Sequence, residues 1–131
     1  LLHDLGLIEA LRALIAEFRQ GEEIEVRAAL PEADPGLSEA VSLSLFRIVQ
    51  EALTNIRKYA QARHVGVSLR FTPTTIELSI EDDGVGFDPE SPKLARHGLA
   101  GIRHRVFTHG GRLDIRAAPG GGVTIMAVLP A

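Results

Sequence analysis

Three polar residues in the middle of the chain have a spacing that could support phosphate chemistry. Glu51, Asn55 and Lys58 lie four and three residues apart, which places them on one face of an α-helix, opposite an apolar face. A carboxamide oxygen suits magnesium, an ammonium group pairs with phosphate, and a carboxylate can take a proton or orient a metal's water shell. Ordinary solvated helix faces have the same spacing, and the helix by itself favours that plainer interpretation.

A second group of candidate residues follows an alternating apolar segment. From Ile76 to Asp82 every second side chain points to one face, and that face is apolar up to its last member, Asp82. A carboxylate at the edge of a core is costly unless it meets a donor, and the exocyclic amine of adenine would be one. Gly84 and Gly86 follow, and such glycines let the backbone approach a ligand closely. The alternative is an Asp-Gly turn in which Asp82 accepts from its own backbone.

A further pair of glycines opens the next helical pattern. Gly98 and Gly101 lie at the start of a helix expected over residues 99–109, directly after His97. Free amides at a helix N-terminus favour phosphate, although an ordinary helix start has the same appearance. The preceding segment, residues 88–96, contains two prolines and mixed charge, and either a mobile lid or a plain surface loop fits it.

Hydrophobic periodicity predicts the elements that must position these residues. Helices are expected over 5–18, 37–60 and 99–109, and strands over 24–30, 65–71, 76–80, 113–117 and 123–129. Short turns join consecutive strands, which favours a largely antiparallel sheet. The sequence therefore predicts an α+β fold, a two-layer sandwich with a mostly antiparallel mixed sheet and helices on one face.

Composition narrows the class of protein. A length of 131 residues suits one domain, and 45 % hydrophobic and 24 % charged residues are ordinary for a globular chain. Since there is no cysteine, disulfides and thiolate metal sites are excluded. A net charge of -3 gives no reason to expect nucleic acid as a partner, so an anionic ligand must be held locally. No apolar run suits a membrane span and no signal peptide is visible, so we expect a cytoplasmic location without membrane contact by this segment.

The order of the motifs resembles one family. Each motif is weak alone, but their order and spacing are specific, and together they resemble the ATPase domain of sensor histidine kinases. The resembling segments are the N box at 46–60, the first glycine box at 82–87, the second at 98–106, the last hairpin at 118–130, and an entry segment at 4–11. The entry segment resembles the branch that signals to response regulators with helix-turn-helix output domains. The fold implied is the ATP-binding sandwich shared with gyrase, the mismatch-repair ATPases and a heat-shock chaperone.

The resemblance implies a domain division and an activity. Residues 1–20 would be an entry helix leading from an absent dimerisation domain, and residues 21–131 the ATP-binding catalytic domain. The chain begins at Leu1 rather than methionine, so we expect that a further segment precedes it. The domain would bind Mg-ATP and donate its γ-phosphate to a histidine on that dimerisation domain, and a response regulator would act downstream.

The resemblance also implies residue roles. Asn55 would coordinate the magnesium bound to the ATP phosphates, and Asp82 would hydrogen-bond the adenine amine. Glu51 would be the catalytic carboxylate, as in related ATPases where a helix glutamate activates water, although in histidine kinases an acidic residue beside the acceptor can serve instead. Further residues implied around the nucleotide are Lys58, Tyr59, Gly84, Gly86, His97, Gly98, Leu99 and Gly101.

Two positions depart from the family pattern and one is ambiguous. Val123 stands where a threonine usually follows the last glycine, with Thr124 next, so either the register shifts locally or a hydrogen bond is absent. Tyr59 stands where histidine is common. Leu2-His3-Asp4 looks like the phosphorylated histidine-aspartate pair, but only one short helix separates it from the domain, so we interpret His3 as a coincidence.

Three other interpretations stay open. A serine kinase of the anti-sigma-factor type shares the fold, but the entry segment and the sequence of the possible lid favour the histidine kinase branch. A degenerate module would bind nucleotide without phosphoryl transfer; Asn55 and Asp82 argue against it, and Val123 argues mildly for it. A plain α+β scaffold would use none of these residues as ligands.

Overall fold

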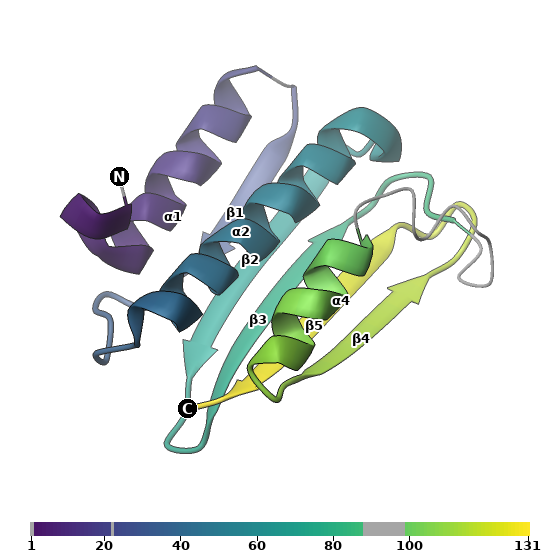
Figure 1. The fold of residues 1–131 in the computed structure, drawn as a ribbon. Helices are drawn as coiled ribbons and strands as arrows, with labels where there is room; N and C mark the ends of the chain where they lie inside the picture. Colours follow the sequence, from purple (N-terminus) through teal and green to yellow (C-terminus); the bar gives the residue numbers. More distant parts are fainter. Residues whose placement is uncertain (1, 22, 88–98) are drawn as a thin grey trace.

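The chain forms one mixed sheet with helices packed on one of its faces. The computed structural model describes residues 2–21, 23–87 and 99–131, and Figure 1 shows the helices in front of the sheet. In chain order the elements are α1 (Leu2–Gln20), β1 (Glu25–Ala29), α2 (Glu39–Asn55), η1 (Ile56–Ala60), β2 (His64–Phe71), β3 (Thr75–Asp82), α4 (Leu99–Thr108), β4 (Arg112–Ala117) and β5 (Val123–Pro130). The predicted α+β fold is confirmed.

The sheet has the strand order β1-β2-β3-β5-β4. β1 pairs with β2 in parallel, and the other three pairings are antiparallel. The parallel pair follows from the long α2 connection between β1 and β2, because parallel neighbours need a crossover. β3 and β5 lie in the centre, so the end of β3 is held on both sides, by Val65 of β2 and Val123 of β5 opposite Asp82.

The first helix is longer than the sequence predicted, and it is interrupted. It begins at Leu2 and ends at Gln20, but Gly6 has φ 77° and ψ 170°, which are not helical values. Glycine tolerates such a conformation, so the first turn is set at an angle to the rest. The remaining helix buries Leu7, Leu11 and Ile15 against the core, as the periodicity predicted.

The second helix is shorter than predicted and changes its winding. Ser38 begins it, where its hydroxyl accepts from the Val41 N–H at 3.2 Å, a favoured cap at a helix N-terminus. The α-helix ends at Asn55, and residues 56–60 continue as one π-helical turn that ends at Gln61 with φ 52°. A π turn closes hydrogen bonds over five residues instead of four, so each residue advances less around the axis. The predicted helix to residue 60 is therefore α only as far as Asn55.

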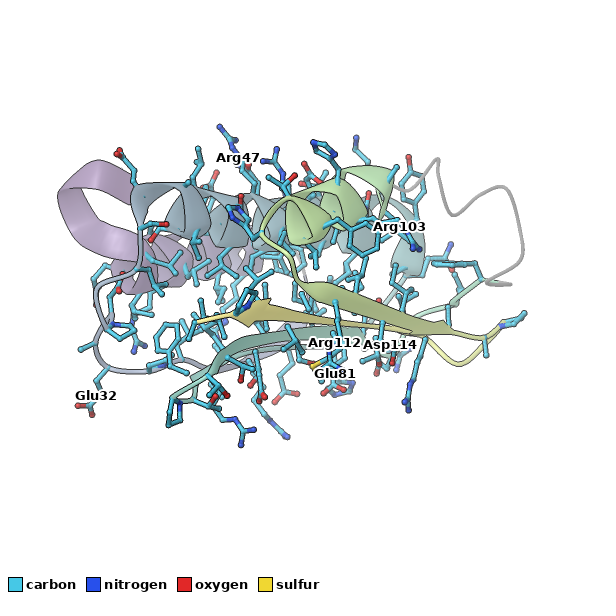
Figure 2. The ribbon with its side chains drawn as sticks, turned by 60° about the horizontal axis from the view of Figure 1, so that its bottom comes forward. Glu32, Arg47, Glu81, Arg103, Arg112 and Asp114 are labelled. Carbon is cyan, nitrogen blue, oxygen red and sulfur yellow. The ribbon has the colours of Figure 1, made fainter. Side chains whose placement is uncertain are left out.

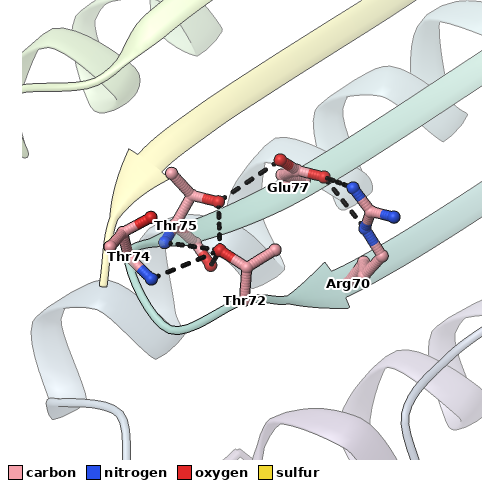
Figure 3. A network of polar contacts seen from close by, with 5 residues as sticks. All are labelled: Arg70, Thr72, Thr74, Thr75 and Glu77. Carbon is pink, nitrogen blue, oxygen red and sulfur yellow. Dashed lines mark hydrogen bonds and ion pairs between the residues drawn. The ribbon is translucent and has the colours of Figure 1, made fainter.

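The predicted turn between residues 72 and 75 is closed by threonine hydroxyls. Thr72 Oγ1 accepts from the Thr75 N–H at 2.9 Å and contacts the Thr75 hydroxyl at 2.6 Å. That hydroxyl donates onward to Glu77, which is paired with Arg70 across β2 and β3 (Figure 3). These contacts fix the β2–β3 register at the end of the sheet that lies away from the candidate site.

The core lies between the helices and the sheet. Figure 2 shows side chains filling this layer, with Arg47 and Arg103 on the helical side and Glu81, Arg112 and Asp114 on the sheet side. Fully buried residues from both layers meet there, among them Leu11, Ile48, Ile80, Ile102 and Leu129. None of the helices in the part of the chain that the structure describes combines the length and hydropathy that a membrane span requires.

Candidate functional site

A pocket opens where the helical layer meets the ends of the central strands. It contains about 470 Å³ of empty space, part of it open to solvent. Asn55 and Tyr59 line it from the helices, Asp82 and Val123 from the sheet, and Leu99 from the start of α4. The end of α2, the end of β3 and the β4–β5 hairpin meet at the upper right of Figure 1.

Asp82 is the charged residue among those described around the pocket. Its carboxylate oxygen Oδ1 accepts from the Gly84 N–H at 2.8 Å, and the Val123 N–H contributes a second backbone hydrogen bond. Desolvation by burial nevertheless raises the pKa of Asp82 above its ordinary value of 3.8. An ionised carboxylate has about four acceptor positions, so the self-capping turn considered as the alternative is present and still leaves acceptor capacity for a ligand.

The two glycines after Asp82 are required by close backbone contacts. A Cβ on Gly84 would lie 2.1 Å from the carbonyl oxygen of Ala60, and Gly86 has φ 63°, a left-handed value. The Val85 N–H donates to the Ala60 carbonyl at 2.7 Å, so the turn is tied to the end of η1. The Gly120 N–H donates to the Val85 carbonyl at 2.6 Å, which ties the β4–β5 hairpin to the same turn. Gly86 lines the pocket, whereas Gly84 packs on η1.

Asp83 anchors this turn from the other side of the sheet. Its Oδ1 accepts from the N–H groups of Arg63 and His64, both at 2.9 Å, and its Oδ2 lies 2.7 Å from Nδ1 of His64. The hydrogen bonds from the His64 backbone and ring, followed by that from Arg63, lower the pKa of Asp83 to about 2. Sequence analysis gave Asp83 no role, because its partners lie nineteen and twenty residues away in the chain.

We expect Asp83 to make the fold sensitive to strong acid. A carboxyl group whose folded pKa is depressed stabilises the fold fully above the unfolded value, and this stabilisation is lost as pH falls from 3.8 towards about 2. The side chain is 48 % exposed, so solvent screening keeps the effect small. Asp83→Asn should lower the Tm at neutral pH by about 1–4 °C.

Thermal melts across this pH window provide the measurement. Asp83→Asn should show a smaller fall in Tm than the wild type between pH 3.8 and about 2. Asp114→Asn, which removes an exposed pair with Arg116 at 3.0 Å in β4, is the matched control. Equal acid sensitivity in Asp83→Asn and the wild type would contradict the assigned anchor.

Asn55 stands at the junction between α2 and the π turn and lines the pocket. Its Nδ2 atom is buried and has no hydrogen-bond partner among the described residues. A buried polar atom without a partner calls for an explanation, and a ligand in the pocket is one. Which end of the carboxamide faces the pocket depends on the assignment of its oxygen and nitrogen, and rotation by half a turn would present the oxygen instead.

The π turn separates the two residues that follow Asn55. Tyr59 lines the pocket, whereas Lys58 is exposed and is not among the lining residues. A regular helix already places Tyr59, four residues on, beside Asn55, and the reduced advance per residue in the π turn moves Lys58 further away from it. The sequence predicted Asn55 and Lys58 on one helix face. The structure places Asn55 at the pocket and Lys58 away from it.

Glu51 lies beside α4 instead of lining the pocket. Its Oε1 atom is 3.6 Å from Nε of Arg105, and a Cβ on Gly101 would lie 3.0 Å from its Oε2 atom. The structure thus places Gly101 against Glu51, and Leu99 in the pocket wall. Sequence analysis did not single out Arg105, whose four-residue spacing from Gly101 on α4 was the available signal. His97 and Gly98 lie outside the described residues.

Val123 takes a regular place in the sheet. It pairs with Asp82 in an unbroken β3–β5 register, and its side chain faces the pocket, while Thr124 pairs with Glu81. Of the two possibilities drawn from the sequence, the shifted register is therefore wrong. The position beside Asp82 offers a backbone N–H but no side-chain hydroxyl.

The chain is similar to known proteins over nearly its whole length. A family model described as "Histidine kinase-, DNA gyrase B-, and HSP90-like ATPase" matches residues 40–131. The chain is 39 % identical over 98 % of its length to the signal transduction histidine-protein kinase/phosphatase DegS of Brevibacillus brevis, and 40 % identical over 93 % to the sensor histidine kinase ComP of Bacillus subtilis (strain 168). It spans 33 % and 16 % of those two proteins. The solved mycobacterial sensor histidine kinase MprB superposes with a TM-score of 0.70 at 28 % identity, over 93 % of this chain and 92 % of that one.

Proposed function

The chain belongs to the histidine kinase-, DNA gyrase B- and HSP90-like ATPase family, and we propose that it binds Mg-ATP and donates the γ-phosphate to a histidine. That histidine would lie on a dimerisation domain outside residues 1–131, and the phosphate would pass on to a response regulator. Relatives named as histidine kinases, at 39 % and 40 % identity, support this kinase branch.

The observation that carries the proposal is Asp82 at the edge of a largely apolar pocket. Its neighbours there include Ile80, Val123 and Ile125, which suit the flat faces of a purine. A carboxylate that retains acceptor capacity can receive the adenine amine, and it would be repelled by the keto oxygen that guanine has at the same position. The two backbone donors from Gly84 and Val123 hold the carboxylate in place.

The described residues fit a magnesium ion that arrives with the phosphates. No group of three or more His, Cys, Asp or Glu residues that could hold a metal is found over 2–21, 23–87 and 99–131. The metal commonly keeps several waters and takes only one or two protein ligands when phosphates supply the others. Asn55 would provide one oxygen, and bound magnesium would neutralise charge on the phosphates.

The chemistry to be supported is an in-line displacement at the γ-phosphorus. A nitrogen of the acceptor imidazole forms a bond to phosphorus, the bond to the bridging oxygen breaks, and ADP leaves with that electron pair. The proton on the other imidazole nitrogen must pass to a base. We assign this role to Glu51, one helical turn before Asn55.

The isolated chain is expected to bind ATP without phosphorylating itself. Phosphoryl transfer depends on positioning an acceptor in line with the γ-phosphate, and His3 precedes the interruption at Gly6 in α1. Lost orientation should keep self-labelling at least about a hundredfold below transfer to the proper acceptor. Incubation with radiolabelled ATP, with and without the parent protein's dimerisation segment, measures the difference.

The acid stability of the transferred phosphate distinguishes the proposed histidine kinase from the two alternative functions. Acid-labile phosphate on the added segment supports histidine transfer, whereas acid-stable phosphate on a protein substrate would indicate the serine kinase. ATP binding without any transfer to the segment would indicate a nucleotide-binding module. Stoichiometric labelling of His3 would overturn the interpretation of Leu2-His3-Asp4 as a coincidence.

A further inference from the structure

We propose that Arg105 is a positioning residue that, together with Gly101, fixes the Glu51 carboxylate for phosphoryl transfer. The inference rests on the proposed function and adds residues of α4 to its machinery. Glu51 is on α2, whereas Arg105 and Gly101 lie four residues apart on α4, so both face the same point of the neighbouring helix.

The two oxygens of Glu51 have different surroundings. Oε1 is 3.6 Å from Nε of Arg105, which is a charge contact longer than a hydrogen bond. Oε2 is buried and has no hydrogen-bond partner among the described residues. One oxygen thus contacts a cation, while the other is buried beside Gly101 with its acceptor capacity unused, and a buried polar atom without a partner calls for an explanation.

Gly101 makes this arrangement possible. A Cβ at position 101 would lie 3.0 Å from Oε2 and 3.5 Å from Oε1 of Glu51. A side chain there would require the carboxylate to shift by a few tenths of an ångström. The glycine therefore provides space for the carboxylate, in addition to any role in the resembling glycine box.

Among the described residues, Glu51 forms an ion pair with Arg105. The Nε atom of Arg105 is buried and has no hydrogen-bond partner among those residues. α4 begins at Leu99 in the pocket wall, so the helix that carries Gly101 and Arg105 also borders the pocket. These two residues connect the pocket side of α4 with Glu51 on α2.

The first test is a comparison of binding and turnover. Arg105→Met should lower kcat for transfer to the dimerisation segment by about 10- to 100-fold, part of what a positioned base contributes. The Kd for ATP should change by less than about twofold, and the Tm should change by less than about 4 °C. Arg105→Lys, which restores a cation, should recover part of the loss. Arg103→Met removes an exposed arginine from the same helix, 5.9 Å from the Phe107 ring, and should leave kcat unchanged.

The second test is a double-mutant cycle with Glu51→Gln. If Arg105 acts through Glu51, Arg105→Met should cost no further activity once Glu51 is replaced, because the two losses are coupled. Additive losses would overturn the inference, and so would a parallel fall in kcat, ATP affinity and Tm, which indicates a structural role. Normal transfer by Arg105→Met overturns the inference alone, whereas a wild-type protein that binds ATP but transfers nothing overturns the proposed function and the inference with it.

Discussion

Asp82→Asn is expected to weaken ATP binding by about 5- to 150-fold, corresponding to about 1–3 kcal/mol. The carboxamide offers one acceptor oxygen where the carboxylate offered two, and Gly84 and Val123 already use backbone donors on this side chain. The amide nitrogen would also place a donor opposite the adenine amine. Calorimetric titration with Mg-ATP measures the loss.

The same residue should determine the choice of base. The wild type is expected to bind Mg-ATP more tightly than Mg-GTP, and Asp82→Asn should reduce this preference. Equal wild-type affinities for the two nucleotides would remove Asp82 from the adenine site. Asp114→Asn, on exposed β4, serves as a control that should leave both affinities unchanged.

Because the pKa of Asp82 is raised, we expect this residue to affect ATP binding and the stability of the fold differently. Burial raises this pKa above 3.8, so the protonated carboxyl group stabilises the fold. This stabilisation is complete below the unfolded pKa and is lost as pH rises through the folded pKa. At neutral pH the ionised carboxylate is therefore a cost to the ligand-free fold. Asp82→Asn should lose ATP affinity without a matching loss of Tm, and ATP affinity of the wild type should fall as acid protonates Asp82.

Asn55→Ala is expected to weaken ATP binding by about 10- to 100-fold when magnesium is present, as loss of support for a metal typically does. With excess chelator the variant and the wild type should bind ATP nearly equally. The reason is that Asn55 is assigned to the metal, while the purine contacts on the sheet side are unchanged. Binding curves with magnesium and with chelator provide the measurement.

Neighbouring substitutions make the Asn55 test specific. Asn55→Asp keeps an oxygen ligand and should retain magnesium-dependent binding. Thr54→Ala removes only a side-chain hydrogen bond to the Gln50 carbonyl, 2.8 Å long on the exposed side of α2. An identical loss for Asn55→Ala under both conditions would show that the residue contacts nucleotide or supports the helix, and does not ligate the metal.

Several features of the fold could be read from local patterns. Alternation along β3 predicted that Asp82 shares the buried face with Ile80, and the structure places both in the pocket lining. The helical spacing predicted the buried side of α2, including Val49 and Leu53. These predictions succeed because side-chain direction within one element depends on backbone geometry that repeats every few residues.

Contacts between different helices and strands could be established only from the tertiary structure. A regular helix predicts both Lys58 and Tyr59 close to Asn55, but of these two only Tyr59 lines the pocket, because the π turn moves Lys58 away. Gly101 resembles a nucleotide-binding glycine in the sequence, yet its nearest side chain is Glu51 of α2. The winding of a helix end and the face it presents to a neighbour depend on packing, which no local period encodes.

The sequence by itself determined the two-layer fold, the buried strand that ends in Asp82 and the helix that carries Asn55, because hydrophobic periodicity specifies which face of each element is buried. Only the tertiary structure decided that Asp83 anchors the turn through His64 and that Arg105 lies against Glu51. Their side chains belong to different elements, and such contacts arise when the packed core sets the distance between those elements.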